Sequence, residues 1–507
     1  MTLKDLQPYP VWQYFEEICQ IPRPSKKEER ISAFLLEFAK KHRLEAKQDE
    51  VGNVLIKKKA TAGMENLPLV VLQSHIDMVC EKNADTVHDF AQDPIRPIVD
   101  GEWVRAEGTT LGADDGIGMA AQLAILASDT ICHGALECLF TVDEETGLTG
   151  AFALQPDFLE GNILLNLDSE DEGEMFIGCA GGMDTVAAIP IKYTTTCSVA
   201  TSAATSIKAS VLPTVTLFAA KVSVKGLLGG HSGDDINKGR GNAIKILTRF
   251  LWELNNKYGI YLSAIDGGNL RNAIPREANV VFVLPSDCKE KLMADFNVYG
   301  AEMENVWRLT EGRLVLELES VDMPEKRLDA QTTTNLLNAL YACPHGVFAM
   351  SYRMPGMVET STNLASVKMQ SVHSTDNDGT QIIITTSQRS DIDSEKKNIA
   401  NMVASVFRLV NAQVTHNGGY PGWAPNPHSS ILKVALSTYK KLFGKEPLIR
   451  SIHAGLECGL FLEKYPNMDM LSFGPTLKGV HSPDERVNIK SVEMWWTHLL
   501  EILKTIK

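Results

Sequence analysis

The sequence predicts an α/β protein in which an outer domain, with a mostly parallel sheet flanked by helices, is interrupted by an inserted α+β domain. Apolar runs alternate with helical patterns in the first part of the chain, as in a parallel sheet covered on both faces. Near Gly182 the composition turns to Ser, Thr and Ala with little helical periodicity, and after "THNGGYPGWAPNP" the alternation returns. We therefore expect the outer domain at residues 1–184 and 416–507 and the inserted domain at residues 185–415.

The first part of the outer domain alternates between helices and strands. Apolar faces predict the helices, and short apolar runs bounded by turn residues predict the strands. In chain order we expect helices at 11–20 and 27–42, a strand within 49–60, a strand at 68–73, a helix at 116–128, and strands at 135–142 and 162–168.

The inserted domain is richer in β-branched segments. We expect strands at 216–226, 278–285, 314–320 and 380–388, with helices at 241–257, 331–342 and 394–411. The Ser/Thr-rich stretch at 193–214 fits no pattern of its own. The outer domain then ends with a helix at 429–443, a short strand at 469–473 and a closing helix at 491–505.

The overall composition argues against several classes of protein. The chain has 507 residues, of which 44% are apolar and 22% charged, as in ordinary globular proteins. Its formal charge of −14 argues against a nucleic-acid or anionic-membrane partner. Nine scattered cysteines without a C-x-x-C pair indicate reduced thiols. No signal-peptide pattern and no apolar run near the ~20 residues of a membrane span are visible, so we expect a cytoplasmic protein.

Four acidic or histidine motifs stand at the ends of predicted elements of the outer domain. They are Ser74-His75-Ile76-Asp77, Asp114-Asp115, Asp143-Glu144-Glu145 and Asp168. Ligands of open α/β sheets bind beyond the carboxyl ends of the strands, so three strands would send the first, third and fourth motifs to one rim. Each motif alone is more often a solvated turn or loop, but their shared position favours a common site.

A metal would explain this gathering of like charges. Carboxylates that converge on one rim repel one another unless a cation holds them. His75 and Asp77 face the same way in an extended segment, and a carboxylate commonly orients a ligating imidazole. Mixed histidine and carboxylate ligands suit Zn²⁺, Mn²⁺ or Co²⁺ better than Ca²⁺ or Mg²⁺. The run "GIGMAA" at 116–121 fits a loose dinucleotide fingerprint, but no apolar strand precedes it and Asp114 and Asp115 would oppose a pyrophosphate.

Seven motifs can be compared with a known family: "SHIDMV", "TTLGADDGIGMA", "TVDEETGLTGA", "NLDSEDEGE", "GGHSGDDINKGRGNA", "RNAIPREA" and "GPTLKGVHSPDERV". Together they resemble the aminoacyl-histidine (Xaa-His) dipeptidases of a dimetal zinc peptidase family that also holds carnosinases and peptidase T. The resemblance runs from about residue 5 to the end. The family pattern often has Asp-Asn where this chain has Asp114-Asp115, so the first position is kept and a second acidic side chain is added.

The resemblance implies a catalytic domain interrupted by a lid domain, and a centre of two Zn²⁺ ions for which Co²⁺ or Mn²⁺ can substitute. By motif match Asp114 bridges the ions, Asp77 orients the histidine before it, and Glu144 is the general base. The ligands that the match implies are His75, Asp114, Glu145, Asp168 and His481. Spacing alone does not choose between the two acids of each pair, and it does not assign a ligand to one ion.

The lid domain carries three further candidates. The glycine-rich loop around His231 can approach a ligand closely, and the resemblance implies that His231 polarises the scissile carbonyl. Asn272 and Arg389 are candidates for holding the C-terminal carboxylate of the substrate, Arg389 by a bidentate bond. A structural salt bridge is the alternative for Arg389. His453 and Glu457, at an expected helix start, are left out of the ligand set.

The resemblance therefore implies metal-dependent hydrolysis of dipeptides, both Xaa-His (carnosine-like) and other unblocked dipeptides, by a metal-bound hydroxide with Glu144 as base. The expected partners are a dipeptide substrate and a second copy in a homodimer, with no nucleic acid and no membrane. Two alternatives stay open: an amidohydrolase that deacylates N-acyl amino acids, and a non-catalytic metal-binding scaffold. The scaffold predicts the loss of Glu144 or of a ligand, and the sequence keeps them all.

Overall fold

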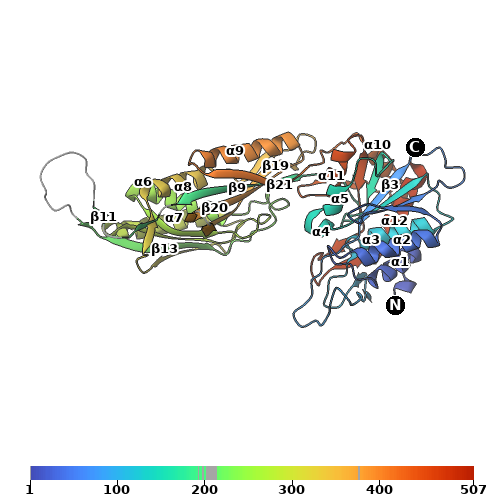
Figure 1. Cartoon of the computed structure of the whole chain (residues 1–507), viewed down its shortest axis with the longest axis horizontal. Helices are drawn as coiled ribbons and strands as arrows, with labels where there is room; N and C mark the ends of the chain where they lie inside the picture. Colours follow the sequence, from blue (N-terminus) through green and yellow to red (C-terminus); the bar gives the residue numbers. More distant parts are fainter. Residues whose placement is uncertain (1, 192, 197–198, 201–213, 375–376) are drawn as a thin grey trace. The chain divides into compact units, whose positions relative to one another are not determined.

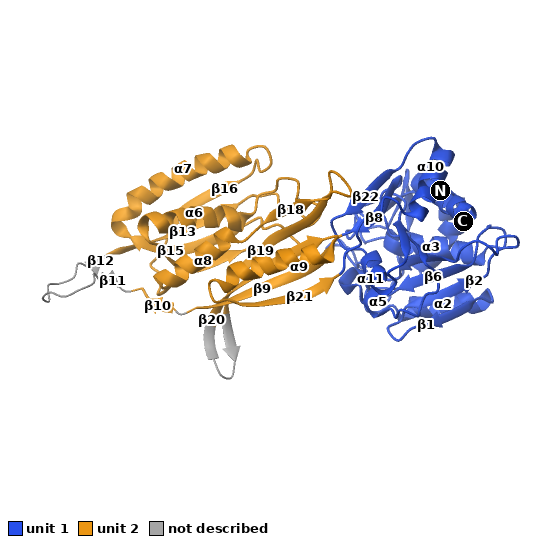
Figure 2. Ribbon diagram, turned by 90° about the horizontal axis from the view of Figure 1, so that it is seen from above, with its two compact units in different colours: residues 1–179, 421–507 blue, residues 180–420 orange. Residues whose placement is uncertain are grey.

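The chain forms two compact units in a computed structural model that describes residues 2–191, 193–196, 199–200, 214–374 and 377–507. Unit 1 comprises residues 1–179 and 421–507, and unit 2 comprises residues 180–420 (Figure 2). The boundaries expected from the sequence, after 184 and after 415, instead lie inside strands β9 (Gly181–Ile191) and β21 (Gln413–Tyr420). These two strands pair with each other, so both belong to unit 2 over their whole length.

An eight-stranded sheet forms the centre of unit 1 (Figure 1). Neighbours among β6, β3, β7 and β23 run parallel, as do β8 and β22, whereas the β1–β2, β2–β6 and β23–β8 pairs are antiparallel. Strands β3 and β6 are buried at every position, as expected for a sheet covered on both faces. The order is β1 (Glu45–Gln48), β2 (Val54–Lys58), β6 (Leu136–Thr141), β3 (Val70–His75), β7 (Ile163–Asn166), β23 (Asp469–Ser472), β8 (Glu174–Cys179) and β22 (Leu448–Ile452).

Helices cover this sheet. Helix α1 packs on α3 and α3 on β3, while α10 packs on α12 and β23. The helices are η1 (Leu3–Asp5), α1 (Tyr9–Cys19), α2 (Glu29–Lys41), α3 (Ala113–Ala127), α4 (Glu144–Gly147), α5 (Thr149–Ala153), α10 (Ser430–Phe443), α11 (Glu457–Lys464) and α12 (Ile489–Thr505). A small antiparallel sheet joins β24 (Leu477–Lys478), β25 (Arg486–Asn488), β5 (Trp103–Arg105) and β4 (Ile98–Asp100).

Unit 2 is built on a nine-stranded antiparallel sheet. Helices α6 (Ala243–Tyr258), α7 (Lys289–Trp307), α8 (Ala330–Ala342) and α9 (Asp393–Arg408) cover one face of it (Figure 2). The sheet order is β16 (Val315–Ser320), β13 (Leu217–Lys225), β15 (Ala278–Pro285), β14 (Tyr261–Gly267), β19 (Val358–Ser374), β20 (Asn377–Ser390), β9 and β21, with β18 (Gly346–Met350) also on β19. Smaller elements are β10 (Tyr193–Thr195) with β17 (Lys326–Leu328), β11 (Val199–Ala200) with β12 (Thr214–Val215), and η2 (Ser286–Cys288).

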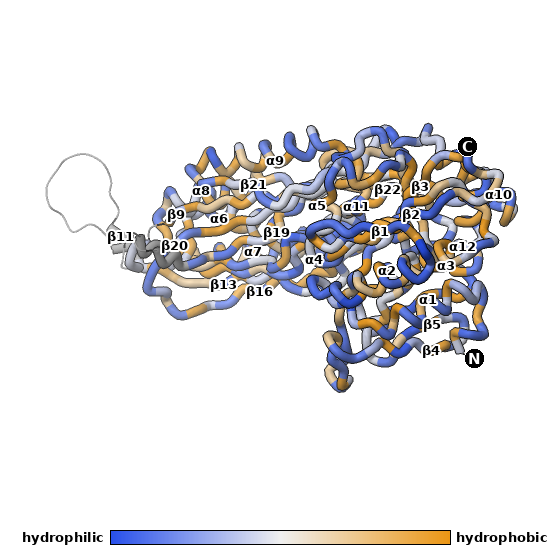
Figure 3. Tube along the Cα trace, turned by 45° about the vertical axis from the view of Figure 1, so that its right-hand side comes forward, coloured by the Kyte–Doolittle hydropathy of each residue, from blue (hydrophilic) through white to orange (hydrophobic). Residues whose placement is uncertain are grey.

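Hydrophobic positions recur along the strands and helices of both units, with hydrophilic positions between them (Figure 3). In unit 2 the core lies between α6 and the strands beneath it, where Leu247, Leu251 and Phe282 are buried. Helix α7 is absent from the sequence-based expectation. It buries only Leu292, Tyr299 and Met303, so its apolar residues are too few to predict a helix from the sequence.

Two further expectations concern whole-chain properties. Within the described residues, no helix combines the length and apolarity needed to cross a bilayer. The cysteines of the described part of the chain are all free thiols. Residues 197–198 and 201–213 of the Ser/Thr-rich stretch lie outside the described residues.

Candidate metal centre

Three neighbouring strands of unit 1 deliver polar side chains to one edge of the sheet. Strand β3 ends at His75, opposite Thr141 at the end of β6, and Gln73 of β3 lies opposite Asn166 at the end of β7. The segments after β6 and β7 carry the Asp143-Glu144-Glu145 run and Asp168. Because parallel strands in register end together, these groups emerge side by side.

Asp114 stands between two histidines. One of its oxygens, Oδ1, lies 3.1 Å from His75 Nε2, and the other, Oδ2, lies 3.3 Å from His481 Nε2. His75 Nε2 is also 3.5 Å from Asp168 Oδ1, and His481 Nε2 is 2.9 Å from Glu145 Oε2. The structure therefore brings all five predicted ligands together, as two imidazole–carboxylate pairs that face one shared carboxylate.

The donor set fits divalent cations. His75, Asp114 and Glu145 each offer a ligand atom, and these atoms lie within 4.8 Å of one another. Glu145 Oε1 is buried and has no hydrogen-bond partner among the described residues. Imidazole nitrogen mixed with carboxylate oxygen is a set that Zn²⁺ and its neighbours accept.

The pKa shifts show how strongly these charges act on one another. Burial raises the pKa of Asp168 to about 7 and that of Glu144 well above its usual range. Hydrogen bonds to Asp114 and Glu145 raise the pKa of His481 to about 11. Burial works against ionisation of Asp114 too, but the two imidazoles hold its pKa below the usual range. Each carboxylate here thus needs a positive neighbour, which an imidazolium or a metal ion supplies.

Asp77 connects His75 to the loop that follows β6. Its Oδ1 lies 3.3 Å from His75 Nδ1 and accepts the backbone N–H of Glu144 at 3.0 Å. Its Oδ2 accepts the backbone N–H of Glu145 at 3.2 Å and the hydroxyl of Ser25 at 2.8 Å. Asp77 is therefore placed to orient the imidazole and, at the same time, the two glutamates.

The structure separates the acids that spacing could not tell apart. Asp114 contacts both histidines, whereas Asp115 Oδ1 accepts the backbone N–H of Gly118 at 3.1 Å, inside α3. Of the two glutamates, Glu145 contacts His481.

Three buried charged residues lie near this edge: Glu457, which the sequence analysis placed near the site but outside the ligand set, and Arg23 and Glu485, which it did not single out. Glu457, at the first turn of α11, accepts hydrogen bonds from Gln73 Nε2 at 2.6 Å and Thr141 Oγ1 at 2.9 Å, and burial raises its pKa to about 8. Arg23 and Glu485 bind the backbone of Gly112 and Asp114. All three contact residues that are distant in sequence, so no local spacing identifies them. Only Glu485 has a sequence signal, its position in the motif "HSPDERV".

The predicted lid residues lie together in unit 2. Arg389, only 7% exposed, has Nη2 3.3 Å from His231 Nε2, Nε 3.3 Å from Ser232 Oγ and Nη1 3.1 Å from the Tyr420 hydroxyl. The carbonyl of Asn272 accepts the N–H of Ser232 at 2.8 Å. The hydrogen-bond partners of the Arg389 guanidinium here are thus an imidazole and two hydroxyls.

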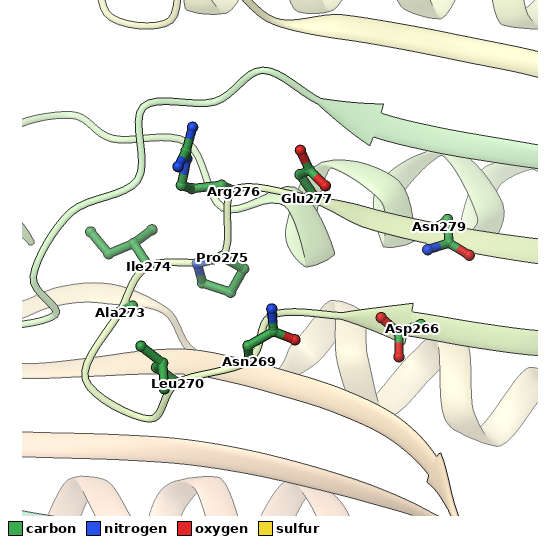
Figure 4. A pocket seen from close by; sticks show the side chains of 10 residues that line it. Asp266, Asn269, Leu270, Ala273, Ile274, Pro275, Arg276, Glu277 and Asn279 are labelled. Atoms are coloured by element: carbon green, nitrogen blue, oxygen red, sulfur yellow. The ribbon is translucent and has the colours of Figure 1, made fainter. Parts of the chain in front are cut away.

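A surface pocket of about 430 Å³ lies beside the loop between β14 and β15 in unit 2 (Figure 4). Asp266, at the end of β14, and Arg276, before β15, line it. Asp266 pairs with Lys368 at 3.0 Å, and Arg276 Nε donates to the carbonyl of Leu227 at 3.0 Å. Asp266 and Arg276 thus both have partners within unit 2.

Comparison with known proteins places the chain among the peptidases. The model of peptidase family M20/M25/M40 matches residues 71–505. The chain is 45% identical over 511 residues to the cytosol non-specific dipeptidase of Escherichia coli (strain K12), across 99% of each chain. The chain therefore belongs to peptidase family M20/M25/M40.

Solved structures agree with this assignment. Aminoacylhistidine dipeptidase from Vibrio alginolyticus matches with a TM-score of 0.89 and 44% identity, covering 100% of this chain and 98% of that one. A tripeptidase from Staphylococcus aureus shares the fold, with a TM-score of 0.58 and 18% identity over 99% of each chain. The predicted fold class and family resemblance are confirmed by these matches.

Proposed function

We propose that this protein is a metal-dependent dipeptidase that hydrolyses unblocked dipeptides, including those of the Xaa-His type. The observation that carries the proposal is the carboxylate of Asp114, which faces His75 and Asp168 on one side and His481 and Glu145 on the other. The names of the Escherichia coli and Vibrio alginolyticus relatives support a dipeptide substrate, and the first supports a location in the cytosol.

Two zinc ions would be held by this set, one by His75 and Asp168 and one by His481 and Glu145, with Asp114 shared. When bound, such ions supply Lewis-acid activation of the attacking water and of the scissile carbonyl. The same ligands accept Co²⁺ or Mn²⁺.

Glu144 acts as the general base. Its carboxylate takes the proton of the attacking water and later passes it to the leaving amine, a role typically worth about 10²–10⁴ in rate. Burial raises the pKa of Glu144, which makes its carboxylate a stronger base toward the proton of water. Asp77 keeps both Glu144 and His75 in place through its two oxygens.

The residues of unit 2 bind the substrate. Arg389 presents a buried guanidinium, the group best suited to a bidentate hold on the C-terminal carboxylate of a dipeptide. Asn272 hydrogen-bonds the same end, and His231 donates to the scissile carbonyl as negative charge develops on its oxygen.

The test combines metal analysis of the purified protein with a substrate panel measured before and after chelation. We expect about two zinc ions per chain, turnover of carnosine and other unblocked dipeptides, loss of turnover on chelation, and recovery with Zn²⁺ or Co²⁺. Faster turnover of N-acetyl amino acids than of dipeptides would assign a deacylase instead. Metal binding without turnover of dipeptides or N-acetyl amino acids would support a non-catalytic metal-binding scaffold instead. Light scattering of the same sample tests the expected homodimer.

A further inference from the structure

We propose that Arg23 and Glu485 are positioning residues, which clamp the loop 111–114 from opposite sides and so set the geometry of the metal centre. Nothing in the resemblance or the comparisons assigns them a role. The inference rests on the proposed function, because it concerns how the protein presents Asp114 to the metal ions. Four observations lead to it.

Glu485 holds the N–H side of the loop. Its side chain is buried, at 2% exposure, and its two oxygens accept four successive backbone N–H groups. Oε2 accepts from Leu111 at 2.7 Å and Gly112 at 2.9 Å, and Oε1 accepts from Ala113 at 2.8 Å and Asp114 at 3.3 Å. A carboxylate bound in this way fixes the orientation of four peptide planes, including that of the shared ligand.

Glu485 also ties this loop to a second ligand. It lies in the same short segment as His481, and its own backbone N–H donates to the carbonyl of Ser482 at 3.0 Å. His481 has a left-handed backbone, with φ of 61°, which a non-glycine residue holds only against strain. The anchored carboxylate therefore fixes the distance between the backbone of Asp114 and that of His481.

Arg23 holds the carbonyl side of the loop. It is also 2% exposed, and its Nη1 donates to the carbonyls of Ile76 at 3.0 Å and Asp77 at 2.5 Å. Its Nη2 donates to the carbonyl of Gly112. The guanidinium thus joins the loop to the segment that directly follows the first histidine ligand.

Gly112 makes the close approach of Arg23 feasible. Its φ is 68°, and a Cβ built there would lie 2.7 Å from Arg23 Nη2 and 2.9 Å from Met78 Sδ. A second glycine, Gly116, would likewise place a Cβ 2.7 Å from Arg23 Nη2. The loop is therefore shaped around the guanidinium by two residues without side chains.

The cost of burying these charges points to a role beyond packing. Desolvating an isolated ionised group is expensive unless hydrogen bonds replace water. Both side chains form their hydrogen bonds with the backbone of segments that carry proposed metal ligands. Together they join the segments of His75, Asp114 and His481, which are distant in sequence. Groups that orient metal ligands typically change metal affinity by about 10–100-fold when they are replaced.

The experiment uses the full chain, loaded with Co²⁺, and the variants Glu485→Gln and Arg23→Lys. Glu485→Gln keeps the shape but turns one acceptor oxygen into a donor that faces backbone N–H groups. Arg23→Lys keeps the charge but cannot reach three carbonyls with a fixed fork. The readouts are the visible d–d spectrum of bound Co²⁺, Co²⁺ affinity by competition with a chelator, the kcat and KM for a dipeptide, and thermal unfolding of the metal-free protein.

A matched control is Glu137→Gln in the same unit. Glu137 is also fully buried and accepts two backbone N–H groups, from Glu160 at 2.9 Å and Gly161 at 3.0 Å, but it lies at the start of β6, away from the ligands. Glu137 also pairs with Lys57 at 3.2 Å, so this variant measures the loss of both backbone contacts and an ion pair at a site away from the ligands.

For each clamp variant we expect a loss of Co²⁺ affinity of about 10–100-fold for at least one ion, an altered d–d spectrum, and a fall in kcat that exceeds any rise in KM. For Glu137→Gln we expect the wild-type spectrum and affinity. If Arg23→Lys, or a folded Glu485→Gln, kept the wild-type Co²⁺ affinity and spectrum, this inference would be overturned, but the proposed function would not. If Glu485→Gln does not fold, Arg23→Lys decides. Failure of the wild-type protein to bind two ions or to cleave dipeptides would overturn the proposed function as well.

Discussion

At the scale of single residues, two residues at the candidate metal centre have a strained, left-handed backbone. His481 has φ of 61° and Asp143, directly before Glu144, has φ of 49°, both in the left-handed region that favours glycine. Each such residue costs of the order of 1 kcal/mol or more and persists where its surroundings fix it. Asp143 is fixed by the hydroxyls of Thr146 and Thr149, which both donate to its carboxylate.

Replacement of Glu144, the proposed general base, should lower the rate of the chemical step without changing metal binding. We expect Glu144→Ala to lower kcat by about 10²–10⁴ while metal content and thermal stability stay near those of the wild type, because Glu144 contacts neither histidine. Steady-state kinetics and metal analysis measure the two effects. The control is Glu65→Ala, which removes an exposed carboxylate from a loop. Near-full activity in Glu144→Ala would show that another residue is the base.

A buried imidazole should make the stability of unit 1 depend on pH. His498 Nε2 lies 3.0 Å from the carbonyl of Ala435 and 3.1 Å from the Thr438 hydroxyl, and burial lowers its pKa from 6.5 to about 4. The folded protein keeps the ring neutral, whereas the unfolded chain protonates it below about pH 6.5. This contribution to stability is therefore present above pH 6.5 and is lost as the pH falls to about 4, by roughly 3 kcal/mol.

Urea unfolding of the metal-free protein at about pH 7 and about pH 4.5, compared with His498→Asn, measures this contribution. The variant should be less stable at the higher pH and should lose less stability between the two. Parallel losses in the two proteins would show that another group is responsible.

The sequence could name the candidate residues of the site but could not choose among adjacent acids. His75, Glu144, Glu145 and Asp168 stand after apolar runs that end in polar groups, and Asp114 stands just before a predicted helix. The choice of Asp114 depends on local structure that spacing does not show. Residues 114 and 115 have non-helical φ and ψ at the start of α3, and Asp114 faces the two histidines whereas Asp115 accepts the N–H of Gly118. Arg23 and Glu485 escape prediction for a related reason: they bind backbone, which leaves no pattern of paired side chains.

At the scale of elements, long amphipathic segments were predictable and sparse ones were not. Helix α10 was expected at 429–443 and spans Ser430–Phe443, because apolar residues recur on one face and Gly444 ends it with a φ of 70°. Helix α7 was missed because Met293, Val298 and Val306 are exposed and blur its buried face. Strands β8 and β22, at one edge of the unit 1 sheet, were also missed, since their alternating burial is weak.

The cap of α12 should contribute measurably to the stability of unit 1. Asn488 Oδ1 accepts the backbone N–H of Ser491 at 2.9 Å, at the start of a helix that buries Trp495 and Leu499. We expect Asn488→Ala to lower the free energy of unfolding by about 1 kcal/mol and Asn488→Ser to lower it less, because serine also caps well. Urea unfolding measures both. An alanine variant as stable as the serine variant would mean that the cap is not used.

At the scale of the whole molecule, the chain leaves and re-enters unit 1 at neighbouring points. Cys179 and Trp423 exchange two backbone hydrogen bonds of 2.9 Å, and in unit 2 Gly182 lies opposite Tyr420 across β9 and β21. The insertion of a whole domain was predictable from the change in composition. The crossing points were not, because the pairing of β9 with β21 extends unit 2 beyond the change in composition.

Unit 1 should therefore fold without unit 2. We expect a chain in which a short Gly/Ser linker joins residue 179 to residue 421 to unfold cooperatively and to bind Co²⁺, because all five proposed ligands remain. Dipeptide turnover should be lost, because His231, Asn272 and Arg389 are removed. Circular dichroism, Co²⁺ titration and a dipeptide assay measure these outcomes. A shortened protein that stays unfolded would show that unit 1 depends on the rest of the chain.

The position of β23 sets an order of events during synthesis. This strand fills the place between β7 and β8, although β8 ends at Cys179 and β23 begins at Asp469. A growing polypeptide therefore carries a gap in the middle of its first sheet while the whole of residues 180–420 emerges from the ribosome and can fold. The gap closes late, and His481 follows still later, so the full set of five proposed ligands is complete only near the end of translation or after release.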